Sequence, residues 1–319
     1  MQQVFSIPKQ GYCYDSTSLY VFKNNLNKVY IETIDIKTSQ NTGSLEVTCS
    51  SPIRFYTHVD SDYVYLIDGN SNLLIIDKFD GIINEKYKLN AIPICSPETN
   101  SNYIYVFTVL PTKTSNIQFT TFFLQIISKL NGKHTKRQFF QGNPNKKLLL
   151  NNSVFYSSSN RLFCCDLQGN FKWESILKGN MLSPPLMNKE YIFNYSLDGL
   201  VQVNDHNGKI VLNIQLEKTE CEPCLEEDFI WFYDKFSYHI NIEKAIHREK
   251  NWQIKKEEST TPITCGLMKN KELFLVSENQ ITYKKQKLQT KQPVLRMNSL
   301  SKNKILGDCG SELVIIEHD

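Results

Sequence analysis

The stretch "LLIIDKFDG", Leu73 to Gly81, returns in altered form as "LQIISKLNG", Leu124 to Gly132. In both, an apolar run of strand type meets a polar marker residue, and a glycine follows four positions later. Similar markers recur about every 40 residues, each after two apolar runs that turn residues separate, as in antiparallel strands joined by hairpins. The full set of markers is Asp35, Asp77, Ser128, Asp166, Asn204, Asn241, Lys284 and Glu317.

Eight units of this length, each with about four strands, predict an all-β fold, an eight-bladed β-propeller of four-stranded antiparallel blades, with seven blades as the alternative. Tyr65, Phe155 and Phe193 lie 11 or 12 positions before their markers and are candidate core residues. We expect one propeller domain over residues 1–319. The last unit stops at Asp319 without a fourth strand, and residues 2–7 are strand-like without a blade of their own. The N-terminal strand should therefore close the ring by completing the last blade and covering its open edge.

Composition indicates a globular chain that buries a real core, with 40% hydrophobic residues among 319. The 36 Lys+Arg and 33 Asp+Glu leave a net charge of +3, which gives no reason to expect a nucleic acid partner. No signal-peptide pattern opens the chain and no apolar run is long enough to span a bilayer. We expect an intracellular, cytoplasmic protein without membrane insertion, and leave a nuclear location open. Nine cysteines in such a chain favour buried, reduced thiols over disulfides.

Several units begin with a small residue before proline, which suits a tight turn leading into the strand nearest the axis. Examples are "CSSP" (Cys49 to Pro52), "CSP" (Cys95 to Pro97) and "LSPP" (Leu182 to Pro185). Together with the Leu-x-x-x-Asp core and Trp173 in "GNFKW", these motifs resemble the quinoprotein-like, or PQQ-like, repeat propellers. The resemblance covers most of the chain and is close in three units.

That resemblance implies pyrroloquinoline quinone and calcium at the axis as one alternative. Quinoprotein enzymes are longer, however, and we find no counterpart of their calcium ligands or catalytic aspartate. Cys164 and Cys165 are adjacent, as in the vicinal disulfide of some such enzymes, but an alternating strand should point one thiol to each side. Cys221 and Cys224 in "CEPC" lack the second pair that a structural zinc site needs. We therefore assign no catalytic residue, cofactor or metal.

Two surface features are candidates for binding a protein partner. Leu110 to Phe122 lengthens the third unit and should form a long projecting hairpin loop that carries Ile117 and Phe119. The second feature is "KKQKLQTK", which could offer a basic patch to an acidic protein or RNA, with Arg296, Lys302 and Lys304 nearby. Its candidate partner-binding residues are Lys284, Lys285, Lys287 and Lys291.

The function that these observations favour is a non-catalytic propeller scaffold for protein partners, a subunit of a larger complex. Two alternatives stay open at this stage. One is a quinoprotein-like propeller that binds a cofactor or substrate, and a small molecule in the central channel fits that alternative. The other is an accessory propeller of an acyl-adenylating enzyme system of the β-alanine-activating type, to which similar propellers are appended.

Overall fold

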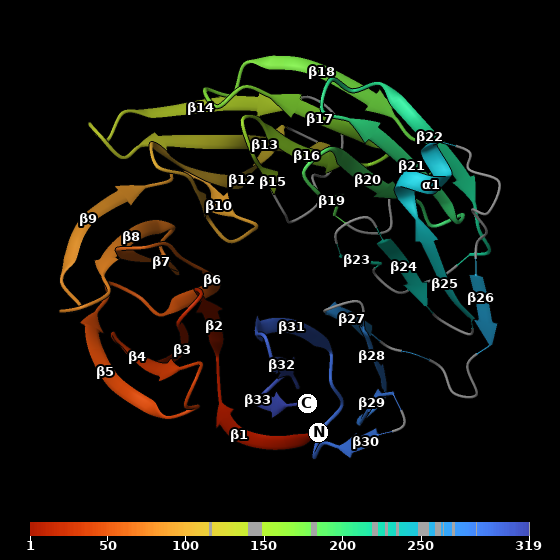
Figure 1. The fold of residues 1–319 in the computed structure, drawn as a ribbon. Helices are drawn as coiled ribbons and strands as arrows, with labels where there is room; N and C mark the ends of the chain where they lie inside the picture. Colours follow the sequence, from red (N-terminus) through yellow and green to blue (C-terminus); the bar gives the residue numbers. More distant parts are fainter. Residues whose placement is uncertain are drawn as a thin grey trace. The chain divides into compact units, whose positions relative to one another are not determined.

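The computed structural model has the fold class that the repeat predicts, an eight-bladed β-propeller of antiparallel blades (Figure 1). Seven sheets have four strands, and in the third blade the first strand is present as two short pieces. The seven-blade alternative is wrong. The structure describes residues 1–114, 117–139, 149–179, 184–218, 223–226, 229–233, 236–247, 255–258, 263, 265–269, 272–284 and 286–318.

The chain divides into two compact units. The N-terminal unit comprises Lys9–Phe155 and Cys165–Lys172, and the C-terminal unit comprises Met1–Pro8, Tyr156–Cys164 and Trp173–Asp319. The first three blades belong to the N-terminal unit: β2 (Gly11–Tyr14), β3 (Ser18–Asn25), β4 (Lys28–Asp35) and β5 (Asn41–Thr48); β6 (Ile53–Val59), β7 (Tyr63–Asp68), β8 (Asn72–Asp77) and β9 (Ile83–Lys88); β10 (Ile92–Pro93), β11 (Glu98–Thr99), β12 (Tyr103–Thr114), β13 (Ile117–Ser128) and β14 (His134–Phe139).

The division passes through the fourth blade, which consists of β15 (Leu149–Leu150), β16 (Val154–Ser158), β17 (Arg161–Cys165) and β18 (Phe171–Ile176). The remaining blades belong to the C-terminal unit: β19 (Leu186–Met187), β20 (Tyr191–Tyr195), β21 (Leu200–Asp205) and β22 (Ile210–Gln215); β23 (Cys224–Glu226), β24 (Phe229–Tyr233), β25 (Phe236–Asn241) and β26 (Lys255–Glu258), with the helix α1 (Ile242–Ile246); β27 (Cys265–Lys269), β28 (Glu272–Ser277), β29 (Gln280–Tyr283) and β30 (Gln286–Gln289); β31 (Arg296–Ser301), β32 (Lys304–Asp308), β33 (Glu312–Glu317) and β1 (Gln2–Pro8).

The N-terminal strand completes the last blade. β1 runs antiparallel to β33 from the pair Gln2↔Glu317 to the pair Pro8↔Glu312, and Figure 1 shows the red strand beside the blue one. The Ser6 hydroxyl donates to Glu312 Oε2 at 2.8 Å across the same pair. This confirms the prediction that the two ends of the chain pair in one sheet. The pairing satisfies backbone groups that β33 would otherwise leave unpaired at a sheet edge.

The core lies on the second and third strands of each blade. Tyr65 in β7, Phe155 in β16 and Phe193 in β20 are buried, as their recurrence predicts. The outer strands are mostly exposed; β9, for example, buries no side chain fully. A blade therefore buries its two middle strands and leaves its outer strand largely to solvent.

In the first, second and fourth blades the marker aspartates Asp35, Asp77 and Asp166 lie at the end of the third strand and cap the turn to the fourth. Asp77 Oδ1 accepts the backbone N–H groups of Phe79 at 2.8 Å and Asp80 at 3.3 Å. Gly81, four positions on, has a φ of 75°, which glycine adopts without the strain of a side chain. In the fifth blade the residue that caps this turn is Asp205, which accepts the backbone N–H groups of Asn207 and Lys209. The predicted marker, Asn204, lies one position earlier; its buried side chain donates to the Ser175 hydroxyl at 2.9 Å instead.

The turn between β3 and β4 contains a strained leucine. Leu26 has a φ of 54° and is 83% exposed, so its side chain gains little burial in return for the left-handed backbone. Replacing Leu26 by asparagine, which tolerates this conformation, is expected to raise the free energy of unfolding by about 1 kcal/mol. Urea denaturation followed by circular dichroism measures this change, and an unchanged or lower midpoint would contradict it.

Candidate protein-interaction site

Neighbouring blades meet through a contact that recurs along the chain. At each of four junctions, a side chain of one outer strand lies against the glycine turn between the third and fourth strands of the next blade. A β-carbon added at these glycines would lie 3.3 Å or less from that side chain. All four turns favour glycine because of their positive φ, and Gly169 and Gly208 favour it also because the added carbon would lie 2.8 and 2.6 Å from the neighbouring side chain. The four pairs are Leu45 with Gly81, Tyr87 with Gly132, Arg137 with Gly169, and Trp173 with Gly208.

At two of these junctions the outer-strand side chain also donates hydrogen bonds to the turn. The Trp173 indole donates from Nε1 to the His206 carbonyl at 3.1 Å. Arg137 donates from Nη2 to Asn170 Oδ1 at 2.8 Å and from Nε to the Gln168 carbonyl at 3.4 Å. Trp173, which the sequence singles out, thus fastens the outer strand of the fourth blade to the fifth.

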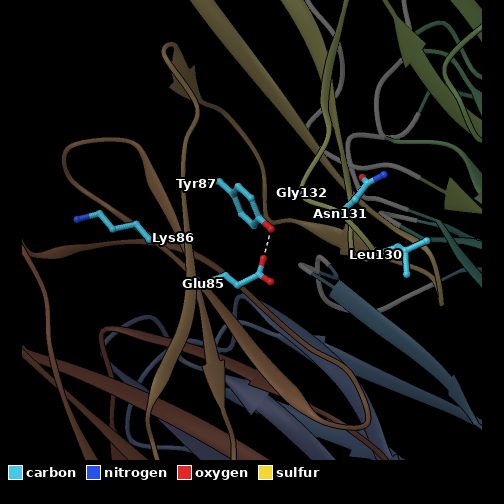
Figure 2. Close-up of a pocket in the computed structure, with 6 residues that line it drawn as sticks. All are labelled: Glu85, Lys86, Tyr87, Leu130, Asn131 and Gly132. Atoms are coloured by element: carbon cyan, nitrogen blue, oxygen red, sulfur yellow. Dashed lines mark hydrogen bonds between the residues drawn. The ribbon is translucent and has the colours of Figure 1, made fainter.

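An open pocket of about 460 Å³ lies at the Tyr87 junction. We call it the Tyr87 pocket; it is lined by Glu85, Lys86, Tyr87, Leu130, Asn131 and Gly132. Figure 2 shows Glu85 and Tyr87 extending from β9 toward the turn that carries Leu130 and Gly132, with the Tyr87 hydroxyl hydrogen-bonded to Glu85. The phenol covers Gly132 but is smaller than the indole at Trp173, and it donates to its own strand rather than to the turn.

Exposed apolar side chains lie on the rim of this pocket and on the equivalent turn of the preceding blade. Leu130 is 92% exposed and Phe79 is 77% exposed. Phe79 and Leu130 both stand two positions after their markers, Asp77 and Ser128, so the repeat places both at the tips of equivalent turns. Large apolar side chains held at rigid turns of adjacent blades are typical of surfaces that dock a protein partner.

A repeated charged contact holds these turns in place. Asp60, in the turn before β7, accepts hydrogen bonds from the Tyr65 hydroxyl at 2.6 Å and from Lys129 Nζ at 2.7 Å. Lys129 belongs to the next blade and directly follows its marker. The first blade repeats the arrangement, since Asp15 accepts from Tyr20 at 3.3 Å and from Lys78 of the second blade at 2.9 Å.

The environment of Asp60 keeps it ionised. Burial alone would raise its pKa, but hydrogen bonds from Lys129, Tyr65 and the backbone N–H groups of Tyr63 and Asp62 lower the pKa from 3.8 to about 2. Burial and the bond to Asp60 raise the pKa of Tyr65, so its hydroxyl stays a donor. We interpret both carboxylate contacts as ties between blades, because the carboxylates are occupied by fixed donors.

The predicted residues Ile117 and Phe119 lie in a strand rather than a loop. β12 and β13 pair without interruption from Tyr103↔Ser128 to Thr114↔Ile117, so the long insertion forms a two-stranded ribbon. The predicted long hairpin is present, but these residues lie in its paired strands rather than in a loop, because alternating β-branched and aromatic residues favour pairing. The side chains of Ile117 and Phe119 lie outside the described part of the chain, and their role in binding stays a prediction.

The predicted basic residues are spread along one outer strand. Lys284, Lys287 and Lys291 are exposed; they lie respectively just before, within and just after β30. Lys285 lies outside the described residues. Lys304, predicted to lie near this patch, is instead 5% exposed in β32, where its carbonyl accepts a 2.5 Å hydrogen bond from the buried Lys269. Partner binding by Lys284, Lys287 and Lys291 stays a prediction.

The sulfur and metal candidates behave as small buried groups where the structure describes them. Cys164 and Cys165 are both buried, and so are Cys13, Cys49, Cys95 and Cys309. Cys224 is partly buried, and Cys221 lies outside the described residues. Within the described ranges, no three His, Cys, Asp or Glu residues lie together as a metal site, and no helix is long and apolar enough to cross a membrane.

Comparison with known proteins supports the fold and no more. No family model and no curated protein matches the sequence. Among solved structures, BamB from Moraxella catarrhalis is similar with a TM-score of 0.71 and 12% identity over 99% of both chains. Saccharomyces cerevisiae Sqt1 has a TM-score of 0.66 and 10% identity over 100% of this chain and 98% of its own. The computationally designed Ika8 protein has a TM-score of 0.67 and 11% identity over 100% of both chains. At these identities the likeness shows a β-propeller fold, and function must be argued from this chain's own residues.

Proposed function

We propose that this propeller is a non-catalytic scaffold that binds a protein partner, as a subunit of a larger complex inside the cell, with the cytoplasm as its location. The observation that carries the proposal is the Tyr87 pocket with Leu130 exposed at its edge on a rigid turn. The junction brings together an aromatic ring, an apolar side chain and hydrogen-bond acceptors. Rigid, partly apolar surfaces of this kind supply the centres of protein interfaces.

The surroundings of the pocket support binding rather than chemistry. Its one carboxylate, Glu85, is exposed and hydrogen-bonded to Tyr87, and no lining residue is a histidine, cysteine or serine that could act as a base or nucleophile. The ties formed by Asp15 and Asp60 keep adjacent turns fixed, and a preorganised surface loses less entropy on binding.

Leu130→Asp is expected to reduce partner binding at least tenfold, because a contact that anchors an interface contributes about 2 kcal/mol or more and about 1.4 kcal/mol is a factor of ten. The measurement is affinity purification of tagged wild type and variant from the native cell extract, with quantitative mass spectrometry, followed by titration of the purified partner. Leu26→Asp is the matched control, since Leu26 is a similarly exposed leucine at another turn of the same unit. Equal loss in both variants, or full binding by Leu130→Asp, contradicts the proposed site.

We propose further that the repeat is of the quinoprotein-like kind and that the two units form one domain. The packing of Trp173 on Gly208 supports the first part. An outer-strand tryptophan is one of the motifs that carry the resemblance, and here its ring contacts the turn of the next blade. A single cooperative unfolding transition, seen alike by tryptophan fluorescence and circular dichroism, would support the second part. Two separate transitions would contradict it.

A further inference from the structure

The four junctions between blades differ in what meets the glycine turn, and this difference suggests what the Tyr87 pocket binds. At Gly169 and at Gly208 an N–H donor from the preceding outer strand reaches oxygen atoms of the turn. At Gly132 the side chain of Tyr87 contacts the turn, but its hydroxyl donates to Glu85 instead. No donor from the described residues reaches the carbonyl groups of Leu130 or Asn131.

The residues that line the Tyr87 pocket supply two side-chain acceptors, the Glu85 carboxylate and the side-chain oxygen of Asn131, which accepts one bond from the Lys133 N–H at 3.0 Å. The backbone carbonyls of Leu130 and Asn131 belong to the same lining residues. The face of the Tyr87 ring adds a π surface that attracts cations. A ligand complementary to this set is planar, positively charged and rich in donors, as a guanidinium group is.

Lys86 is the positively charged residue among those of β9 that line the pocket, and its side chain points away from the pocket. Glu85 and Tyr87 are two positions apart and share one side of β9, whereas Lys86 lies on the other side. Lys86 Nζ donates to the Ser50 hydroxyl at 3.3 Å, and Figure 2 shows its side chain directed away from Tyr87. The charge inside the pocket is therefore that of Glu85, and it complements a cation.

The chain itself contains an example of such an occupant. At the next junction Arg137 lies over Gly169, with its guanidinium donating to a turn carbonyl and to an asparagine oxygen. The methylene stem of an incoming arginine would pack on Leu130, the exposed leucine at the edge of the pocket. We propose that the Tyr87 pocket binds an arginine side chain of the protein partner. The proposal rests on the proposed function and names the chemistry of the partner at the same site.

The test uses the peptide acetyl-Gly-Arg-Gly-amide and its citrulline counterpart, which has the same shape without the charge. Each is titrated into the full-length, deuterated, ¹⁵N-labelled protein while the backbone amide signals of Glu85, Leu130 and Gly132 are followed. The arginine peptide is expected to shift these signals saturably. Its affinity for Glu85→Gln should be at least tenfold lower than for wild type, because the ion pair and the charge-assisted hydrogen bonds are lost. Glu190→Gln, which removes the same charge from an exposed turn of the other unit, should bind like wild type.

Absence of saturable shifts, equal shifts by the citrulline peptide, or wild-type binding by Glu85→Gln would each overturn the proposal. The amide spectrum itself shows that each variant is folded. The outcomes also separate this inference from the proposed function. If Leu130→Asp loses its protein partner while the arginine peptide causes no shifts, the scaffold role stands and the arginine chemistry fails. If Leu130→Asp keeps its partner, the proposed site fails even where the peptide binds.

Discussion

Replacing Asp60 by asparagine is expected to lower the free energy of unfolding by about 3 kcal/mol. The substitution keeps the shape of the side chain but removes the charge that pairs with Lys129, whose side chain is only 21% exposed. It also turns one acceptor oxygen into an amide donor beside the Tyr65 hydroxyl and the Lys129 ammonium. Urea denaturation followed by circular dichroism measures the loss. Asp62→Asn is the matched control, because it removes the same charge from an exposed side chain two positions away. Equal losses of stability in the two variants would contradict the proposed tie between blades.

The loss at Asp60 should depend on pH in a defined direction. Because the folded-state pKa is lowered from 3.8 to about 2, the ionised carboxylate contributes stability that is fully present above pH 3.8 and is lost as the pH falls through about 2. The difference between wild type and Asp60→Asn should therefore shrink by about 2 kcal/mol over that window. A difference that stays constant between pH 5 and pH 2 would show that ionisation of Asp60 plays no part.

Replacing Gly199 by alanine is expected to destabilise the protein by about 3 to 4 kcal/mol. Gly199 lies in the turn between β20 and β21 with a φ of 85°, and an added β-carbon would lie 2.4 Å from the Leu216 carbonyl oxygen and 2.9 Å from that of Glu217. Both obstacles are backbone atoms, and the Leu216 N–H donates to the Gly199 carbonyl at 2.9 Å, so the turn cannot move away without losing this bond.

Two other glycines separate the causes of this loss. Gly310→Ala should cost about 1 kcal/mol, because its φ of 79° is strained for alanine while the nearest atom, Leu295 Cδ1, lies at an ordinary 3.5 Å. Gly43→Ala should change stability by less than about 0.5 kcal/mol, since nothing lies within 4 Å of the added carbon. Urea midpoints that do not follow the order Gly43, Gly310, Gly199 would contradict this account of the turns.

The architecture was predictable because each blade repeats the same local chemistry. Asp77 and Asp166 are found at the ends of third strands because a carboxylate there caps the following turn, and Gly81 and Gly169 follow because the turn needs positive φ. Periodicity misplaced the fifth marker by one position, since Asn204 and Asp205 are adjacent polar residues and only hydrogen bonding distinguishes them.

The site was much less predictable, because it depends on contacts between blades. Asp60 and Lys129 are 69 positions apart, and no local pattern joins them. A signal did exist in the repeat: an aspartate five positions before a tyrosine recurs at Asp15 and Asp60, and a lysine follows the marker at Lys78 and Lys129. The Tyr87 pocket had no such signal, since its lining residues come from two different blades, Glu85 to Tyr87 from the second and Leu130 to Gly132 from the third.

The measurement that tests the scaffold role most directly is native mass spectrometry of the tagged protein isolated from its own cell extract at moderate salt, with an absorbance spectrum and metal analysis of the same sample. The scaffold account predicts a stoichiometric complex with a protein partner and no chromophore or bound calcium. A lone propeller that carries quinone absorbance or calcium would contradict it.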